Sequence, residues 1–504
     1  MKKDISRVNA ASKNIKTSVA GIFLNFLISF LSRKIFILVL GKEFAGFGSL
    51  VGNISALFTL LDFGAAGAVS YRLYEPLAKK DFDKVSQLLS FYSKISRFSG
   101  ALIFVAGLFV LPAVPRFSGN FTDKQTLFAA FFMYVLSLSA SYVFARERML
   151  LFADQKNYIN VLFGYAASAV EVVAECAVLV FFKSYILYIA VHIVITFIED
   201  IIVAVFVRKS YPEISFKNKK IGRETRKELF FEMVQLQPKE ISATLLRTAD
   251  NFFVVSLFGV AANGMYSNYN MLLGYASMIS VSLIGTITAS VGNLNAQSSQ
   301  KNRIRVFEMT DFLSFFMVNV CACILFVLSG NIVTLWLGKA NVLKKSVSVC
   351  LAASFFISGT RSSVAIFRDA CGLYKKEKLK SFSELLMTLF LEFFLGKKFG
   401  IAGIYLGQAL SAFFVCWWYE PYVLFKYGFS CSPADFYLKR LSYFAVFVIS
   451  CFVSDGICRH VEDFLLKLLV CIVLPSALSL FVFCRSSSFL NLLAVARKSL
   501  FSRT

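Results

Sequence analysis

The chain has 504 residues, of which 57% are hydrophobic and only 16% are charged. A soluble protein carries about 25% charged residues, so this composition excludes a soluble domain and indicates a multi-pass membrane protein. The net charge of +23 favours contact with anionic lipid headgroups over nucleic-acid binding, because the excess of cations follows the predicted membrane topology.

Fourteen apolar segments are long enough to cross a hydrocarbon core, which takes about 20 helical residues. Backbone at that depth must satisfy its own hydrogen bonds, so each segment is predicted to be a helix. In chain order the segments cover residues 17–40, 44–70, 97–114, 126–145, 157–182, 184–207, 241–258, 264–290, 309–330, 346–367, 379–396, 400–420, 441–458 and 462–484. The predicted fold is an all-α polytopic membrane protein with about 14 transmembrane helices.

The basic residues are distributed unevenly between the two sets of loops. If the N-terminus is cytoplasmic, 38 of the 53 Lys and Arg residues lie on the cytoplasmic side, 10 on the opposite side and 5 within the spans. This asymmetry is the positive-inside pattern. We expect a multi-pass membrane protein with both termini in the cytoplasm.

The first predicted helix carries a polar stripe. Asn25, Ser29 and Arg33 recur every four residues and share one face, and Lys34 follows them. A charge at mid-helix costs about 2.5–3.5 kcal/mol in lipid, so this face should contact protein or a watery cavity. The alternative is a static ion pair between Arg33 and Asp62 of the second helix.

The second helix leads into a basic segment, YRLYEPLAKKDFDKVSQLLSFYSK, at residues 71–94. Apolar residues recur there at helical spacing beside several lysines. This pattern predicts an amphipathic helix that lies in the membrane interface.

Acidic residues stand inside several later spans. Glu171 and Glu175 lie one turn apart in the fifth helix, and the eleventh helix carries Glu392. Carboxylates this close in a low-dielectric setting favour the uptake of a cation, so we predict ion coupling by Glu171, Glu175, Asp62 and Glu392. A cation from a neighbouring helix that pairs with the glutamates is the alternative.

Cations within the spans favour an anionic cargo. Arginine binds phosphate oxygens in a bidentate way, and Lys34 adds positive charge. The predicted substrate-binding residues are Arg33, Lys34, Asn25, Arg247 and Arg361. An ion pair with Asp250 that only holds the fold is the alternative for Arg247.

The chain shows a trace of internal duplication. LGKEFAGFGSL after the first helix and FGVAANGMYSN after the seventh match at a constant offset, which pairs Gly41 with Gly259 and Gly46 with Gly264. Two pseudo-symmetric six-helix lobes around a central cavity are therefore predicted, with two additional C-terminal helices. The predicted boundaries are 1–210 for the first lobe, 211–239 for a cytoplasmic linker, 240–428 for the second lobe and 429–504 for the last two helices and tail.

Enzymatic functions are poorly supported by the sequence. The chain contains no P-loop, and its only histidines are His192 and His460. A histidine-based catalytic site or a metal cluster is therefore not expected. We predict a transporter without catalytic residues, cofactor or metal.

The succession SR…LG…G…SL…N…L…DFG between Arg33 and Gly64 resembles the bacterial polysaccharide flippases, the Wzx-type branch of the multidrug/oligosaccharidyl-lipid/polysaccharide (MOP) exporter superfamily. Hydropathy and the predicted helix count agree over nearly the full chain. The resemblance implies a flippase that moves undecaprenyl-pyrophosphate-linked polysaccharide repeat units to the outer leaflet by alternating access. Arg33 and Asp62 fall within the family's recurring motif.

The resemblance also implies a location in the bacterial cytoplasmic (inner) membrane and partners there: the undecaprenyl-pyrophosphate-linked glycan, and a polysaccharide polymerase and glycosyltransferases. The acidic residues add H⁺ or Na⁺ as a coupling ion, and the positive charge adds membrane lipids, without nucleic acid. Three alternatives remain: a multidrug/toxin cation antiporter of the same superfamily, a lipid II flippase, for which denser arginines would be expected in the first helix and the loops after it, and a membrane enzyme of polysaccharide assembly.

Overall fold

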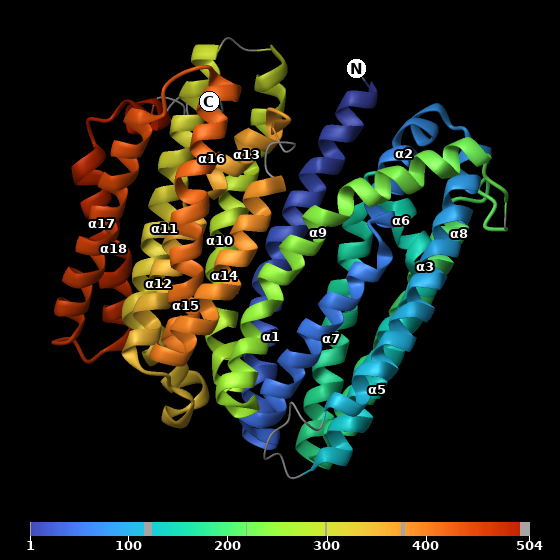
Figure 1. The fold of residues 1–504 in the computed structure, drawn as a ribbon, viewed down its shortest axis with the longest axis horizontal. Helices are drawn as coiled ribbons and strands as arrows, with labels where there is room; N and C mark the ends of the chain where they lie inside the picture. The colour runs from blue at the N-terminus through green and yellow to red at the C-terminus, as the bar shows by residue number, and fades with distance from the viewer. Residues whose placement is uncertain (1, 115–122, 218, 298–299, 374–377, 494–504) are drawn as a thin grey trace. The chain divides into compact units, whose positions relative to one another are not determined.

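All regular structure in the described part of the chain is helical (Figure 1). This computed structural model describes residues 2–114, 123–217, 219–297, 300–373 and 378–493, without the side chains of 2–27, 236, 238–239, 281–297 and 378–379. The chain divides into two compact units, Met1–Gly264 (unit 1) and Met265–Thr504 (unit 2). The all-α prediction is confirmed.

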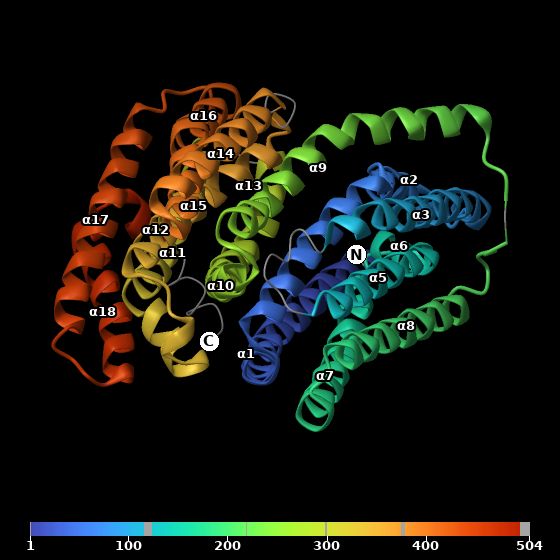
Figure 2. The same ribbon diagram turned by 60° about the horizontal axis from the view of Figure 1, so that its bottom comes forward.

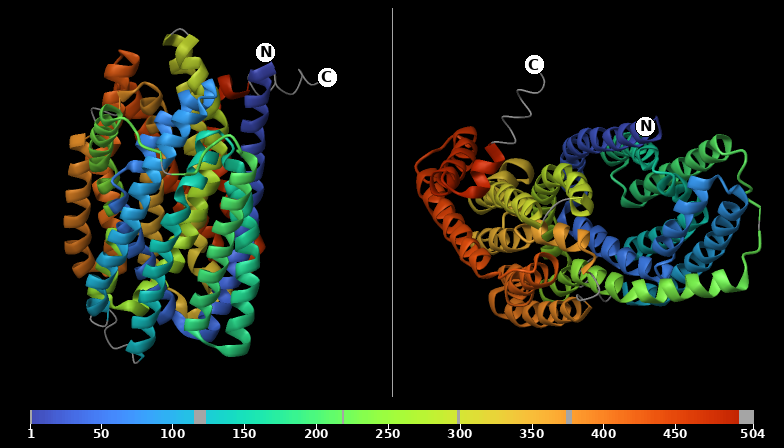
Figure 3. Two further views of the ribbon diagram at one scale, coloured as in Figure 1. Left: turned by 90° about the vertical axis from the view of Figure 1, so that its right-hand side faces the viewer. Right: turned by 90° about the horizontal axis from the view of Figure 1, so that it is seen from above.

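Unit 1 is built from long helices that run side by side (Figure 3). Helix α1 packs against α7 and α9, and α5 packs against α3 and α8. The helices are α1 (Lys2–Phe58), α2 (Ala65–Lys79), α3 (Phe82–Val110), α5 (Lys124–Ser141), α6 (Ala145–Ala153), α7 (Asn157–Phe182), α8 (Tyr185–Ser210) and α9 (Arg223–Phe258), followed by the start of α10 (Val260–Gln297).

In unit 2, α11 is the central helix: it contacts α12, α13, α17 and α18. The helices that follow α10 are α11 (Gln300–Leu337), α12 (Lys345–Gly359), α13 (Ser362–Ala370), α14 (Lys378–Phe399), α15 (Ile401–Ser411), α16 (Trp417–Val423), α17 (Ala434–Cys458) and α18 (Phe464–Phe483). Stacked rings join α17 to its neighbours, with centroids 3.9 Å apart for Phe315 and Tyr443. The two C-terminal helices are thus integral to the packing of unit 2.

Eleven helical segments of the described residues are long and apolar enough to cross a membrane, so the protein is a multi-pass membrane protein. The first, Ile28–Asp62, contains two helices that meet at Gly41. Helices α10 and α14 coincide with the predicted spans 264–290 and 379–396 but are not among the eleven. The number fourteen, the domain boundaries and the central cavity stay predictions.

The matched glycines of the predicted duplication adopt the same conformation. Gly41 has φ 88° and ψ 174°, and Gly259 has φ 85° and ψ 173°. Only glycine adopts such angles readily, so each ends one helix where the next begins. The second matched pair is in contact, because a Cβ on Gly46 would overlap the carbonyl oxygen of Val260, and one on Gly264 that of Lys42.

We expect Gly46→Ala to destabilise the protein by about 1–3 kcal/mol, because the added methyl group would push α1 away from α10. Thermal unfolding of the purified protein measures the effect. Gly52→Ala is the matched control: it lies on α1 with no atom within 4 Å of an added Cβ, and alanine raises helix propensity there. Equal melting temperatures for both variants would contradict the close contact.

The predicted interfacial helix at residues 71–94 is wrong. The segment forms the end of α2 and the start of α3, which meet at Lys80 in a left-handed conformation. Val85, Leu88 and Leu89 are buried in an apolar core with Leu229 of α9. The apolar face that suggested membrane contact packs instead into a protein core, where α3 contacts α2 and α6 and the first half of α9 passes beside α2 (Figure 2).

Candidate functional site

Arg33 lies in a polar region of unit 1 formed by α1, α5, α7 and α8. Its side chain is partly buried and interacts electrostatically with Tyr185 and Tyr188 of α8. Phe36, three residues further along the same face of α1, packs its ring 5.1 Å from that of Tyr188. This face of α1 is therefore directed toward protein, as predicted for the polar stripe.

Two further binding residues were predicted on α1, Lys34 and Asn25. Lys34 is exposed. The side chain of Asn25 lies outside the described residues. The proposed roles of both in substrate binding stay predictions.

The two glutamates of α7 lie beside His192 of α8. The Nδ1 atom of His192 is 2.6 Å from a carboxylate oxygen of Glu171. One ligand atom from each of Glu171, Glu175 and His192 falls within 4.8 Å of the others. Glu175 is only 4% exposed, so the group is partly shielded from solvent.

Two tyrosines connect these glutamates to the surroundings of Arg33. Tyr188 interacts directly with Glu175. Tyr134 of α5 interacts electrostatically with both glutamates, and its ring centroid is 6.0 Å from that of His192. We call the set the membrane polar cluster: Arg33, Tyr134, Glu171, Glu175, Tyr188 and His192.

The membrane polar cluster combines a guanidinium, two carboxylates and an imidazole in one part of unit 1. The sequence predicted Arg33, Glu171 and Glu175 separately, and the structure brings them together through α8. His192 is the group from a neighbouring helix that the sequence left open. The tyrosines were missed, because an aromatic residue in an apolar helix carries no distinguishing signal.

Asp62 lies apart from Arg33. One carboxylate oxygen accepts a hydrogen bond from the backbone N–H of Ala66, at 3.2 Å, at the start of α2. The chain turns back at Gly41 (Figure 1). Arg33 lies about 12 Å of helix before this turn, and Asp62 lies about 30 Å of helix after it. A depth difference of about 20 Å between the two excludes the ion pair considered as an alternative.

Arg247 is exposed on α9, and its guanidinium donates to the Thr244 hydroxyl at 3.2 Å. On the buried side of α9, the Ser49 hydroxyl donates to the side-chain oxygen of Asn251 at 3.0 Å. The structure therefore places the predicted binding residue on the surface of α9, while its buried neighbours join α9 to α1.

Arg361 lies in a buried network of charges in unit 2. Its guanidinium donates to both oxygens of Glu420, at 3.0 and 2.8 Å, and to Glu384 at 2.9 Å. Lys380 also pairs with Glu420, at 2.6 Å, and Arg368 lies 3.3 Å from it. We call these five residues the unit 2 ion-pair cluster.

This pairing uses the donors with which Arg361 would hold a phosphate. The guanidinium of Arg361 is thus hydrogen-bonded to two carboxylates in this structure. Glu420 was missed, although a carboxylate in the apolar sequence WWYEPY is the same kind of signal that identified Arg361.

Glu392 is fully buried on α14, where its backbone lies against Gly407 of α15. One turn earlier, the Thr388 hydroxyl donates to the Ser411 hydroxyl at 2.7 Å. The polar face of α14 is therefore directed toward α15 within unit 2. The role of Glu392 in ion coupling stays a prediction.

A family model described as polysaccharide biosynthesis protein matches residues 11–290, a range that includes the whole membrane polar cluster. No curated protein matches the chain.

Solved transporters and a flippase share the fold. An inward-facing multidrug resistance MATE transporter of the MOP superfamily has 11% sequence identity and a TM-score of 0.66, over 79% of this chain and 94% of its own. The lipid II flippase MurJ, in an inward closed conformation, has 15% identity and a TM-score of 0.64, over 93% and 99%. A MOP superfamily transporter from Pyrococcus furiosus, described by a reverse polarity of its binding pocket, has 11% identity and a TM-score of 0.58, over 82% and 96%.

Proposed function

We propose that this chain, which belongs to the polysaccharide biosynthesis protein family, is a lipid-linked oligosaccharide flippase. Its fold, which is that of MOP transporters, supports the proposal. It would move undecaprenyl-pyrophosphate-linked polysaccharide repeat units from the cytoplasmic to the outer leaflet of the bacterial inner membrane by alternating access. The observation that carries the proposal is Arg33, a partly buried cation inside a membrane-spanning helix.

The substrate presents two chemically different parts. Its polyprenyl tail is soluble in the hydrocarbon core, whereas its pyrophosphate and glycan are not. A protein that lowers the barrier must therefore supply polar groups to the headgroup within the membrane. Arg33 offers bidentate hydrogen bonds to phosphate oxygens, and the exposed Lys34 beside it adds positive charge.

The effect of Arg33 substitutions tests this role. In proteoliposomes that contain a fluorescent undecaprenyl-pyrophosphate-linked oligosaccharide, the rate at which the dye becomes accessible to an external quencher reports translocation. We expect a loss of about 10- to 100-fold in Arg33→Ala, because a hydrogen bond to a charged group contributes about 1.5–3 kcal/mol. Arg33→Lys should retain part of the rate, since lysine is a point charge without the guanidinium fork.

Lys124→Ala is the control for this experiment, because Lys124 is exposed at the start of α5. Wild-type rates in Arg33→Ala would refute pyrophosphate binding by Arg33.

The same vesicles loaded with a cationic dye test the second candidate function, a multidrug cation antiporter. That candidate is favoured by the two glutamates beside His192, and gradient-driven dye export without lipid translocation would establish it.

We further propose that transport is coupled to H⁺ or Na⁺ at Glu171 and Glu175. Carboxylates and an imidazole are suitable ligands for a proton or a small cation in a partly buried site. Tyr188 links Glu175 to Arg33, so cation binding at the glutamates and substrate binding at Arg33 would act on one group of side chains.

A polysaccharide polymerase and glycosyltransferases are the expected partners in the same membrane.

A further inference from the structure

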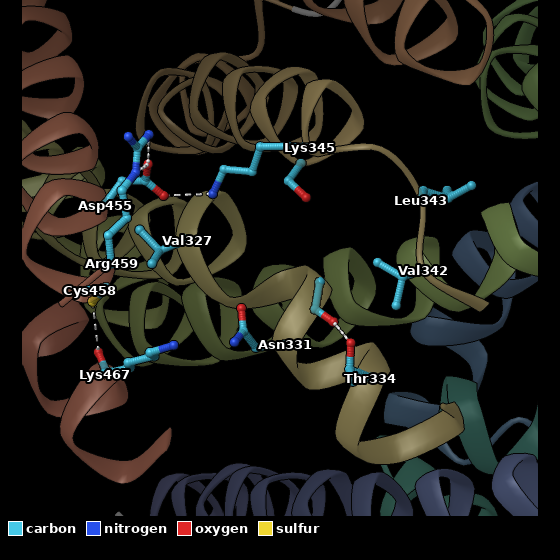
Figure 4. Close-up of a pocket in the computed structure, with 12 residues that line it drawn as sticks. Val327, Asn331, Thr334, Val342, Leu343, Lys345, Asp455, Cys458, Arg459 and Lys467 are labelled. Carbon is cyan, nitrogen blue, oxygen red and sulfur yellow. Dashed lines mark hydrogen bonds and ion pairs between the residues drawn. The ribbon is translucent and has the colours of Figure 1, made fainter. Parts of the chain in front are cut away.

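Unit 2 contains a pocket that lies outside both clusters described above. It has a volume of about 490 Å³ and is formed by the C-terminal part of α11, the start of α12, the end of α17 and the first turn of α18 (Figure 4). Its charged lining residues are Lys345, Asp455, Arg459 and Lys467. Three cations and one carboxylate leave the lining with an excess of two positive charges.

Two of the cations share the single carboxylate. The ammonium of Lys345 is 2.8 Å from one oxygen of Asp455 and also donates to the Phe326 carbonyl at 2.8 Å. The guanidinium of Arg459 is 2.8 Å from the other oxygen of Asp455. Asp455 is therefore fully used by these two residues and leaves the third cation without an acid.

Lys467 is that third cation. Among the described residues its ammonium has no hydrogen-bond or ion-pair partner, and its side chain is partly buried. Figure 4 shows the ammonium directed toward Asn331, whose amide also lines the pocket. An ammonium and an amide N–H that both face a cavity are donors suited to an anionic oxygen.

Helix α12 adds to the positive field. Its N-terminal residues Lys345 and Ser348 line the pocket, and the positive end of a helix dipole favours an anion there. The helices that line the pocket also carry exposed apolar side chains: Leu335, next in sequence to Thr334, is 63% exposed, and Leu466, next in sequence to Lys467, is 54% exposed. Exposed leucines on membrane-spanning helices are suited to acyl chains.

We infer that this pocket binds the phosphate headgroup of an anionic membrane lipid, with Lys467 and Asn331 as donors and the flanking leucines in contact with the chains. The inference does not depend on the proposed transport function. A free phosphate ion would use the same donors, and the leucines favour the lipid.

Native mass spectrometry of the purified full-length protein tests the site with phosphatidylglycerol and phosphatidylcholine as separate probes. We expect preferential binding of phosphatidylglycerol, weakened about tenfold or more in Lys467→Glu, because the substitution removes the excess positive charge of the lining. Asn331→Leu should weaken it less. Lys344→Glu is the matched control, since Lys344 is exposed next to Lys345 but does not line the pocket.

Thermal unfolding of each variant establishes that it is folded before binding is compared. Equal retention of both lipids, or unchanged phosphatidylglycerol binding in Lys467→Glu and Asn331→Leu, would overturn the inference. Displacement of phosphatidylglycerol by millimolar inorganic phosphate would assign the pocket to the free ion and overturn the lipid assignment.

Discussion

Glu420→Gln is expected to destabilise the protein by about 3–5 kcal/mol, the cost of leaving buried charges without their partner. Glu420 is 2% exposed and is the carboxylate that Arg361, Arg368 and Lys380 share. For a unit of this size the loss corresponds to a melting temperature lower by roughly 10 °C. Thermal unfolding of purified protein and the amount of protein in the membrane both measure it.

Asp369→Asn is the matched control. Asp369 also pairs with a cation of the unit 2 ion-pair cluster, Arg368, but its side chain is 56% exposed and the pair is 3.5 Å long. An exposed pair of this kind contributes about 0–1 kcal/mol. The double variant Glu420→Gln, Lys380→Met should recover part of the loss, because it restores the charge balance.

The same variant separates two roles for Arg361. If Glu420→Gln unfolds at the wild-type temperature and reduces only lipid translocation, the unit 2 ion-pair cluster serves the substrate rather than the fold. Reduced stability with a normal rate per folded molecule supports a structural role. In that case the positive charge for the pyrophosphate resides in unit 1, at Arg33.

Glu175→Gln should remove the dependence of translocation on an ion gradient while the protein remains folded in the membrane. The amide keeps the shape of the side chain but cannot bind a cation by charge. Glu175 is 4% exposed and within reach of Glu171 and His192. We expect the stimulation by a gradient to fall about tenfold or more, within the range of ordinary coupling free energies.

Proteoliposomes with an imposed proton gradient, a sodium gradient or neither measure this effect and identify the ion. Glu43→Gln is the control, because Glu43 is an exposed glutamate of α1 outside the membrane polar cluster. Full gradient stimulation in both Glu175→Gln and Glu171→Gln would disprove coupling at these residues. A loss of membrane protein in Glu175→Gln alone would instead indicate that the carboxylate holds α7 to α8.

The sequence was most informative where a local rule applies. Hydropathy over a window of about 20 residues identified the membrane class, because a membrane-spanning helix satisfies its backbone hydrogen bonds within its own segment. The glycine match at Gly41 and Gly259 was also local, since a positive φ of 85–88° depends on one residue. The polar stripe of α1 followed from helical periodicity, and Arg33 indeed faces tyrosines of α8.

Local sequence patterns were insufficient where two different structures are compatible with the same pattern. The amphipathic segment at 71–94 is compatible with a membrane surface as well as with a protein core, and its burial among the helices of unit 1 decided between the two. Arg361 illustrates the same limit. A cation in an apolar helix must be paired or hydrated, but the sequence does not say by which partner, and Glu420 lies 59 residues away.

Class, spans and the identity of the charged residues in the membrane thus depend on properties of single helices, which the order of amino acids encodes directly. The pairing of those charges depends on which helices pack together. Glu171 meets His192 because α7 packs on α8, and Arg361 meets Glu420 because the chain returns through α16. Such contacts join residues far apart in sequence, and periodicity carries no information about them; their energies become defined only when the bundle has formed.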